Sequence, residues 1–386
     1  MTDHDCSFPF SVSQVILSPM FNPENRSALN LLFVSTPVGA LGSGLGGGVE
    51  LTLRNLAQSM QARGNRVSVL APAGSVLPGL PDIEVIAIPG QLQPTAQTQG
   101  RQAPILLPEN SVLANLWEAA YSTQHQYDLI LNFAYDWLPF YLTPFLSRPV
   151  AHLVSMGSLT DAMDQIIEQT LNRFPGTVAV HSQAQAATFA FGERCRCLEN
   201  GLDLSLYTFR PEAENRLGWV GRIAPEKGIE DAILAAQAAG MELKIWGAMP
   251  DQAYWEAIQQ RHPHGTFHYE GFCSTADLQR GLGQCCGLLM TPKWIEAFGN
   301  VAIEALACGV PVIAYKRGGP AEIVEPGKTG WLVEPDDGNG LVEAIGKLAQ
   351  IDRSTCRQQA EARYSLQAMG DRVSLWLQDI LNPSKF

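Results

Sequence analysis

Short apolar runs alternate with segments of helical periodicity in the first part of the chain. Residues 31–36 are an apolar run of strand length, and residues 49–63 repeat apolar side chains along one helical face. Gly64 follows where a glycine commonly ends a helix, and residues 67–70 are the next apolar run. This order of strand, helix and strand predicts a βαβ unit, and a parallel sheet follows from it.

The alternation continues through the rest of the chain. Strands are expected at residues 85–88, 129–132, 150–154, 178–181, 218–220, 243–246, 266–269, 287–289 and 312–315, and helices at residues 229–239, 302–308 and 366–381. The stretch 90–108, rich in Gln, Pro and Thr, is expected to form a long surface loop over the first domain. The pattern predicts two Rossmann-like α/β halves.

Chain length and composition agree with two domains. At 386 residues, 46% hydrophobic and 17% charged, the chain is long enough for two cores and too apolar to be disordered. We expect an N-terminal extension at residues 1–28, a first domain at 29–210, a second domain at 211–365 and a C-terminal helix at 366–386.

The chain is acidic. Its formal net charge is −12, and residues 1–210 hold ten Arg, no Lys and sixteen Asp plus Glu, a net charge of −6. Such a balance disfavours nucleic acid and anionic membranes as partners. No apolar run approaches the roughly 20 residues that span a bilayer, the start of the chain lacks the pattern of a secretion signal, and the eight Cys show no disulfide or zinc spacing. We expect a cytoplasmic protein with free thiols.

Two carboxylates flank a predicted helix start in the stretch KWIEAFGNVAIEALACGVP, residues 293–311. Gly299 permits a tight turn, and Asn300 is a residue type preferred at a helix N-cap. A helix N-terminus offers unpaired N–H groups to a phosphate. Glu296 would lie in the loop before this anion site, and Glu304 about one turn into the helix. The arrangement suits a diphosphate flanked by hydroxyl-rich sugars.

Two cations follow a predicted strand in the stretch GRIAPEKG, residues 221–228. Arg222 offers a planar fork of donors and Lys227 a mobile point charge, and both suit a diphosphate. A solvated loop with two ordinary surface cations is the alternative for this stretch alone. The paired carboxylates downstream favour the diphosphate site.

These motifs, in this order, resemble the donor half of family 4 retaining glycosyltransferases. The resemblance covers residues 31–343 and rests on GRIAPEKG, EGFC at 270–273, TPKWIEAFGNVAIEALACGVPVIA at 291–314, GKTGWLVEP at 327–335 and NGLD at 200–203. It implies the GT-B fold, in which two Rossmann-like domains face each other across a cleft. The first would hold the acceptor and the second the nucleotide sugar, and the C-terminal helix would cross back to the first domain.

The resemblance also implies roles for individual residues. Arg222 and Lys227 should contact the diphosphate, and Glu296 the hydroxyls of the transferred sugar. The amides after Phe298 should cap the distal phosphate, and Glu304 should bind the ribose. Together with the glycine loop described next, the expected donor-binding residues are Gly47, Gly48, Arg222, Lys227, Phe298, Gly299, Asn300, Val301 and Glu304. The family often has other residues at Thr291-Pro292 and Ala297, but the sugar-binding carboxylate is in place.

A glycine-rich stretch, GLGGGVE at residues 44–50, follows the first predicted strand. The family has a Gly-Gly loop here, so Gly47 and Gly48 are expected to approach the diphosphate from the opposite wall; a flexible lid or a plain tight turn is the alternative. A NAD-binding domain would need an acidic residue after the second strand, and residues 71–74, Ala-Pro-Ala-Gly, stand there. A dehydrogenase is therefore disfavoured.

Candidate acceptor and catalytic residues stand at strand ends in the first half. His152 is expected to end a strand and open on the cleft, and its position matches a His with which many relatives contact the transferred sugar. Tyr135 or Trp137 would stack on a flat ring, and Asp136 would accept hydrogen bonds. Solvated loop positions are the alternative for these three residues. His181 is a weaker candidate.

The predicted reaction moves a hexose from a UDP-sugar to a small soluble acceptor with retention of configuration. Arg222, Lys227 and the helix amides would stabilise the departing diphosphate without a metal ion or cofactor. Glu296 would orient the sugar, and His152 completes the expected catalytic set. A two-carboxylate glycosidase is disfavoured, because a phosphate site between the carboxylates would have no purpose there.

The acceptor is suggested by the run FVSTPVGALGSGLGGGVELTLRNLAQ, residues 33–58, which resembles cyanobacterial UDP-glucose–tetrahydrobiopterin glucosyltransferases. A Lys-free acidic first domain with aromatic residues at a strand end is compatible with a flat acceptor such as a reduced pterin. Two alternatives stay open. One is transfer to a glycan or a lipid-linked sugar, and the other is a GT-B nucleotide-sugar epimerase.

Overall fold

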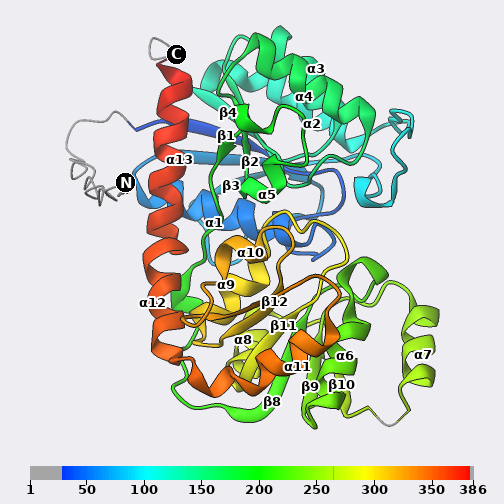
Figure 1. Cartoon of the computed structure of the whole chain (residues 1–386). Helices are drawn as coiled ribbons and strands as arrows, with labels where there is room; N and C mark the ends of the chain where they lie inside the picture. The colour runs from blue at the N-terminus through cyan, green and yellow to red at the C-terminus, as the bar shows by residue number, and fades with distance from the viewer. Residues whose placement is uncertain (1–27, 264, 383–386) are drawn as a thin grey trace, which may run out of the picture.

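The computed structural model describes residues 28–263 and 265–382, which form two α/β domains stacked along the C-terminal helix (Figure 1). The extension expected at residues 1–28 lies, except for its last residue, outside the described residues. Each domain is built on one parallel sheet with helices on its faces, as expected when strands are apolar on both sides.

The first sheet has seven strands in the order β3-β2-β1-β4-β5-β6-β7. The strands are β1 (Asn30–Val34), β2 (Arg66–Pro72), β3 (Glu84–Ile88), β4 (Leu129–Asn132), β5 (Val150–Leu153), β6 (Val178–Val180) and β7 (Arg196–Cys197). The chain adds strands on one side of β1 and then on the other, so the order reverses between β1 and β4. Ligands of open α/β sheets bind beside such a reversal, at the carboxyl ends of the strands.

The second sheet repeats this plan with six strands in the order β10-β9-β8-β11-β12-β13. The strands are β8 (Glu214–Val220), β9 (Glu242–Trp246), β10 (Phe267–Gly271), β11 (Cys285–Met290), β12 (Val312–Tyr315) and β13 (Gly330–Val333). The order reverses between β8 and β11. Both halves therefore have the strand order of a Rossmann fold.

Helices cover both sheets. The first domain contains α1 (Gly48–Ala62), α2 (Val112–Thr123), α3 (Trp137–Leu142), α4 (Asp161–Arg173) and α5 (Gln183–Ala186). The second contains α6 (Ile229–Ala238), α7 (Gln252–Arg261), α8 (Thr275–Gly283), α9 (Asn300–Ala307), α10 (Pro320–Ile323), α11 (Gly338–Gly346) and α12 (Arg353–Arg363), and α13 (Leu366–Leu381) follows. None of the helices in the described part of the chain is long and apolar enough to cross a bilayer.

The predicted α/β fold class is confirmed, and the predicted strands and helices are present within a few residues of their expected bounds. Two strands were missed. The first, β7, has two residues, which is too short for any periodicity, and β13 has four residues and starts at a glycine.

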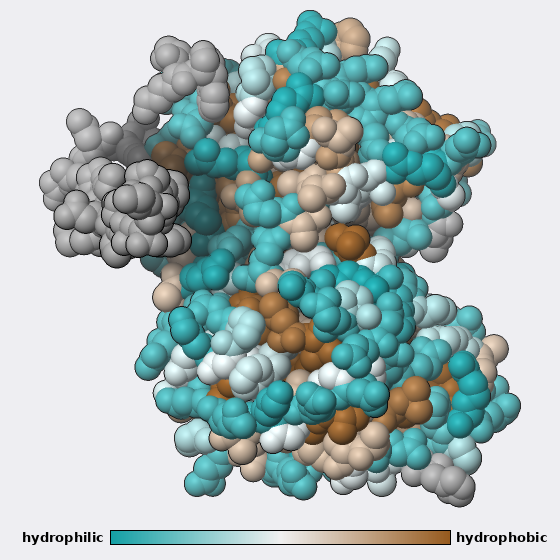
Figure 2. Space-filling view, viewed as in Figure 1, coloured by the Kyte–Doolittle hydropathy of each residue, from teal (hydrophilic) through white to brown (hydrophobic). Residues whose placement is uncertain are grey.

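Helix α13 packs against the first domain although it follows the second in sequence (Figure 1). Its buried Val373, Trp376 and Leu377 join the core that contains Phe33 of β1. The Trp376 indole N–H donates to the carbonyl of Gly176 at 2.7 Å. The apolar stripe of α13 thus ties the end of the chain to the first domain, on one side of the molecule. Figure 2 shows the face of the molecule turned to the viewer in Figure 1 as largely hydrophilic, with apolar residues in small groups.

Candidate functional site

A cavity of about 730 Å³ lies between the two domains. Its walls carry residues that stand within three positions of the end of a strand in both sheets: Thr36, Tyr135 and His181 from the first domain, and Arg222 and Thr291 from the second. The carboxyl ends of the two sheets therefore face each other across this cavity. The points at which the strand order reverses in the two sheets both border this cavity. The cavity is therefore the candidate functional site.

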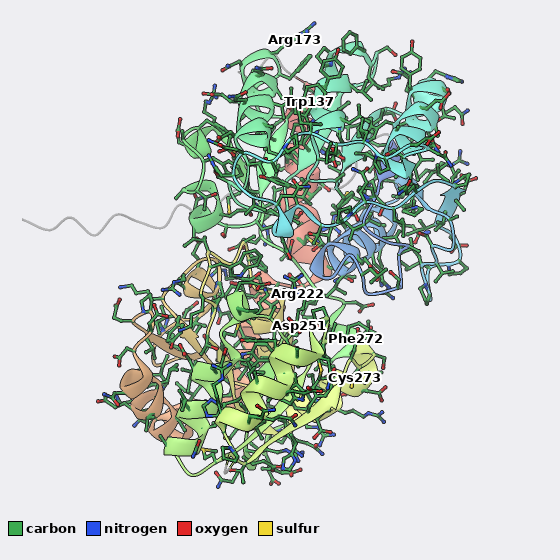
Figure 3. The ribbon with its side chains drawn as sticks, turned by 90° about the vertical axis from the view of Figure 1, so that its right-hand side faces the viewer. Trp137, Arg173, Arg222, Asp251, Phe272 and Cys273 are labelled. Carbon is green, nitrogen blue, oxygen red and sulfur yellow. The ribbon has the colours of Figure 1, made fainter. Side chains whose placement is uncertain are left out.

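The loop after β8 carries both predicted diphosphate-binding cations into this cavity, and Figure 3 shows Arg222 on the side of the second domain that faces the first. A short 3-10 helix, Pro225–Lys227, ends at Gly228, whose φ is 65°. A Cβ atom at Gly228 would lie 2.0 Å from the carbonyl oxygen of Thr291, so a glycine is required. The close approach fixes this loop against the end of β11, and with it the position of Lys227.

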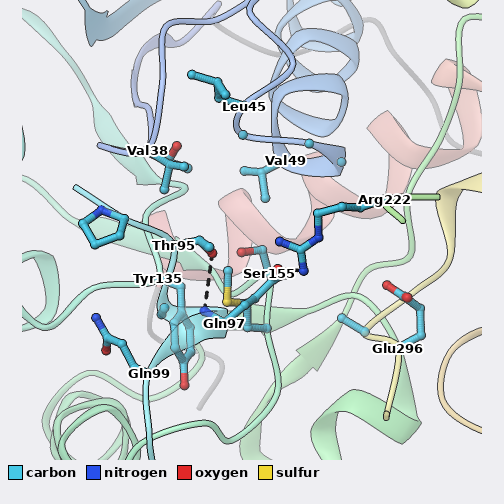
Figure 4. A pocket seen from close by; sticks show the side chains of 18 of the residues that line it. Val38, Leu45, Val49, Thr95, Gln97, Gln99, Tyr135, Ser155, Arg222 and Glu296 are labelled. Atoms are coloured by element: carbon cyan, nitrogen blue, oxygen red, sulfur yellow. Dashed lines mark hydrogen bonds between the residues drawn. The ribbon is translucent and has the colours of Figure 1, made fainter. Parts of the chain in front are cut away.

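Both cations contact carboxylates. The Lys227 ammonium lies 2.5 Å from a carboxylate oxygen of Glu296 and 4.8 Å from the centre of the Trp294 ring. The Trp294 indole N–H donates to the same oxygen at 3.1 Å. Arg222 pairs with Glu226 and donates to the side-chain oxygen of Gln97, in the first domain, at 3.0 Å. Figure 4 shows Arg222 reaching toward the loop that carries Gln97. Lys227 thus pairs with the predicted sugar carboxylate, and Arg222 makes a separate set of contacts at the same cavity.

Helix α9 begins at the cavity wall. Its N-cap is Gly299, with φ 95°, and no side chain caps the helix. The expected N-cap, Asn300, is instead the first helical residue, because the αL turn before it suits glycine alone. The Asn300 side chain accepts from Asn200 at 2.7 Å and donates to the carbonyl of Gly48 at 3.3 Å. The first backbone N–H groups of α9 are therefore available to a ligand. The start of α9 lies close to the start of α1, and Phe298 and Val301 also line the cavity.

Glu304 lies one turn deeper in α9, behind the cavity wall. Only 7% of the residue is exposed, and its carboxylate accepts a hydrogen bond from the Tyr207 hydroxyl at 2.9 Å. The residues that line the cavity include Asn300 and Val301 but not Glu304. Burial raises the pKa of Glu304 to about 7, and the Tyr207 hydrogen bond opposes that rise. Its ribose-binding role stays a prediction.

Glu304→Gln should stabilise the folded chain more at pH 8 than at pH 5. The folded pKa of about 7 exceeds the ordinary value of 4.5, so the folded chain keeps a proton that the unfolded chain has released. The contribution of Glu304 to wild-type stability is therefore greatest below pH 4.5, and it falls by about 3 kcal/mol as the pH rises to 7. Glutamine does not titrate. Thermal melts at both pH values test this, with the exposed Glu334→Gln as control, and an equal difference in Tm at both pH values would contradict it.

The glycine-rich loop before α1 is folded around a carboxylate of its own. The backbone N–H groups of Gly42, Gly44 and Gly46 donate to the Glu50 carboxylate at 2.8, 3.2 and 2.6 Å. These three amides are occupied within the loop and are not free for a ligand. Gly47 and Gly48 do line the cavity. No local pattern had indicated that the Glu50 side chain would fold back onto this loop.

The expectation that His152 opens on the cleft is wrong. His152 is completely buried inside β5, and its ring stacks on Phe140 at 4.1 Å. One ring nitrogen lies 2.9 Å from the Thr143 hydroxyl and the other 3.2 Å from the Asn132 amide nitrogen. Burial lowers the pKa of His152 to about 3, which keeps the ring neutral. The strand continues past His152, and it is Ser155 that reaches the cavity.

Tyr135, Asp136 and Trp137 all line the cavity, after β4. The Tyr135 hydroxyl accepts from the backbone N–H of Leu159 at 3.2 Å, and burial raises the pKa of Tyr135. The Trp137 ring stacks on Tyr141, with 4.5 Å between ring centres. Asp136 caps α3. Tyr135 is buried and Asp136 and Trp137 are half-buried, so the alternative of solvated loop positions is wrong.

The stretch 90–108 supplies a cavity wall that sequence reasoning missed. Its Gln93, Gln97 and Leu106 line the cavity, and Arg101 anchors it to α4 through Asp161 at 2.7 Å. The stretch was expected to be a surface loop. Its length was the available signal, because long connections in compact domains are commonly functional.

Comparison with known proteins agrees with this geometry. Residues 208–365 match the sequence family described as glycosyl transferases group 1. A glycosyltransferase assigned to colanic acid biosynthesis in Salmonella typhimurium, WcaL, is 26% identical over 206 residues, which are 47% of this chain and 50% of WcaL. Glycogen synthase of Mycobacterium tuberculosis is 31% identical over 180 residues, 44% of this chain and 43% of the synthase. The chain thus spans half or less of the length of these relatives.

The fold is shared over nearly the whole chain. Anabaena HepE, solved with UDP and glucose, superimposes with a TM-score of 0.71 at 23% identity and covers 91% of this chain and 99% of its own. The structure therefore has the GT-B fold of glycosyltransferases, with two Rossmann-like domains facing across a cleft.

Proposed function

We propose that this chain is a retaining glycosyltransferase that moves a hexose, in particular glucose, from a UDP-sugar to a small soluble acceptor. The observation that carries the proposal is that Arg222, Lys227 and Glu296 line one cavity between two Rossmann-like domains, together with the uncapped start of α9. The group 1 family match of the second domain and the UDP and glucose bound to HepE support a UDP-sugar donor.

In the proposed reaction the bond from the sugar to the diphosphate breaks as the oxygen of an acceptor hydroxyl attacks, and the hydroxyl proton passes to the departing diphosphate. Arg222, Lys227 and the amides of α9 would stabilise the charge that develops on the leaving diphosphate, without a metal ion or cofactor. Glu296 would accept hydrogen bonds from the sugar hydroxyls. Attack on the face from which the diphosphate departs would retain the anomeric configuration.

For the acceptor we favour a reduced pterin such as tetrahydrobiopterin. A flat ring suits a cavity lined by Tyr135, Trp137 and the apolar side chain of Leu106. The net charge of −6 over residues 1–210 would repel the anionic bilayers in which lipid-linked acceptors reside. A nucleotide-sugar epimerase is disfavoured, since its one obvious acid–base candidate, His152, is buried away from the cavity.

UDP release from UDP-glucose should be stimulated at least tenfold by tetrahydrobiopterin, and the chain should not sediment with anionic liposomes at low salt. A coupled UDP-release assay compares tetrahydrobiopterin, simple sugars and a lipid-linked sugar as acceptors. UDP-glucose alone is the control, and an isomerised sugar there would indicate an epimerase. Activity with the lipid-linked sugar alone would contradict the soluble acceptor and leave the donor site standing.

A further inference from the structure

The acceptor end of the cavity holds a carboxylate that no cation neutralises. Within the described residues, Asp136 forms no ion pair with any Arg, Lys or His, although it is largely buried. Burial disfavours the charged form and raises the pKa of Asp136. A buried carboxylate is normally paired or well hydrogen-bonded. Asp136 therefore needs further donors.

The hydrogen bonds that Asp136 does make are long. One oxygen accepts from the backbone N–H of Leu138 at 3.4 Å, and the other from the side-chain amide of Gln93 at 3.3 Å. The backbone N–H of Trp137 is a third donor to this carboxylate. Charge-assisted hydrogen bonds to carboxylates usually measure about 2.7–2.9 Å. Each carboxylate oxygen can accept more than one hydrogen bond, so both oxygens of Asp136 can serve a ligand in the cavity in addition to these protein donors.

Gln93 fixes the direction of this carboxylate. Its side-chain oxygen accepts from the Ser111 hydroxyl at 3.1 Å, and its backbone N–H donates to the carbonyl of Pro37 at 3.0 Å. The amide nitrogen of Gln93 is thereby directed at Asp136. Only 8% of Gln93 is exposed, so the carboxylate is held by a rigid neighbour.

Flat and apolar side chains line the same cavity as Asp136. Trp137 follows it, with its ring held against Tyr141, and the stretch Ile105–Leu107 lines the same cavity. These three apolar residues are exposed, Leu106 by 72%. Exposed apolar side chains around an unneutralised carboxylate suit a ring that is apolar on its faces and carries N–H donors on one edge.

We propose that Asp136 selects the acceptor by accepting two parallel hydrogen bonds from adjacent N–H groups on the edge of a flat heteroaromatic ring. The 2-amino-4-oxopyrimidine edge of a pterin presents such a pair, through its amino group and the neighbouring ring N–H. The inference rests on the proposed function for the identity of the site as the acceptor site. It assigns Asp136 a specificity role and not a part in bond making.

The test compares two rings that differ at one position. Biopterin carries the 2-amino group, and the matching lumazine carries an oxygen there, which would face the carboxylate as an acceptor. Ring fluorescence titrated with UDP-saturated protein measures both dissociation constants without any turnover. Wild type should bind biopterin at least tenfold more tightly than the lumazine. In Asp136→Asn the two dissociation constants should differ by no more than twofold.

The Asp136→Asn change is suited to this test because asparagine caps a helix as well as aspartate does, so α3 keeps its N-cap. Asp82→Asn removes an exposed carboxylate from the same domain and is the matched control. Asp82→Asn should keep the wild-type preference for biopterin over the lumazine. In turnover, Asp136→Asn should raise the KM for the acceptor at least tenfold and leave the KM for UDP-glucose unchanged.

Two results would overturn the proposal: equal binding of the two rings by wild type, or the same preference in wild type and in folded Asp136→Asn. Failure of the proposed function looks different. If biopterin binds with the expected preference but tetrahydrobiopterin does not stimulate UDP release, the role of Asp136 stands and the proposed transfer to pterin fails.

Discussion

Lys227→Ala and Arg222→Ala should each weaken the binding of UDP-glucose by about 10- to 100-fold. A charge-assisted hydrogen bond contributes about 1.5–3 kcal/mol, and 1.4 kcal/mol corresponds to a factor of ten. In Lys227→Ala the Glu296 carboxylate, now 2.5 Å from the ammonium, would also face the diphosphate without its counterion. Titration calorimetry with UDP and with UDP-glucose measures the two losses.

Lys316→Ala is the matched control for this pair. Its side chain is 61% exposed in the same domain and pairs only distantly with Glu334, at 3.6 Å. Lys316→Ala should bind UDP-glucose with the affinity of the wild type. Dissociation constants within twofold of wild type for both Arg222→Ala and Lys227→Ala would show that the diphosphate does not bind at these cations.

Glu296→Gln should lower kcat about 100-fold while the affinity for UDP stays within twofold of wild type. Glutamine has nearly the same shape and can still accept from the Trp294 indole, but it loses the charge. The backbone carbonyl of Glu296 accepts from Gly319 at 2.8 Å, so the chain around the substitution is held in place. Removal of a preorganised polar group from a reaction centre costs about 10²–10³ in kcat.

The measurements for Glu296→Gln are steady-state kinetics and UDP binding, with exposed Glu334→Gln as the control. A loss of UDP affinity equal to the loss of turnover would place Glu296 on the nucleotide and not on the sugar. Formation of a glycosyl azide from this variant in the presence of azide would show that Glu296 acts as a nucleophile, with a covalent intermediate in place of the proposed mechanism.

The acceptor prediction joins two kinds of evidence. The first is the unneutralised Asp136 beside Trp137, which concerns the chemistry of the cavity. The second is the resemblance of residues 33–58 to pterin glucosyltransferases, which concerns sequence. The two are independent, so one can fail alone. The ring-binding and UDP-release experiments separate them.

The sequence by itself determined the fold class and the elements of the second domain that carry the donor motifs. Apolar runs of strand length predict strands because each is buried on both faces of a parallel sheet, and the periodicity of residues 366–381 predicted α13 with its observed bounds. Arg222, Lys227 and Glu296 were predicted to share one site because each stands near a strand end or a helix start, and all three line the cavity. Local sequence patterns are sufficient to predict residues at the ends of strands and the starts of helices.

Only the tertiary structure decided what depends on contacts between distant segments. The burial of His152 depends on Thr143 and Asn132, on neighbouring elements of the first domain. The loop 90–108 becomes a cavity wall because its Gln97 meets Arg222 of the other domain. The Asn300 side chain is turned toward Gly48 of α1 by the packing of two helices that are far apart in sequence. Periodicity and spacing describe how one element faces the core, and they hold no information about which distant side chain will meet it there.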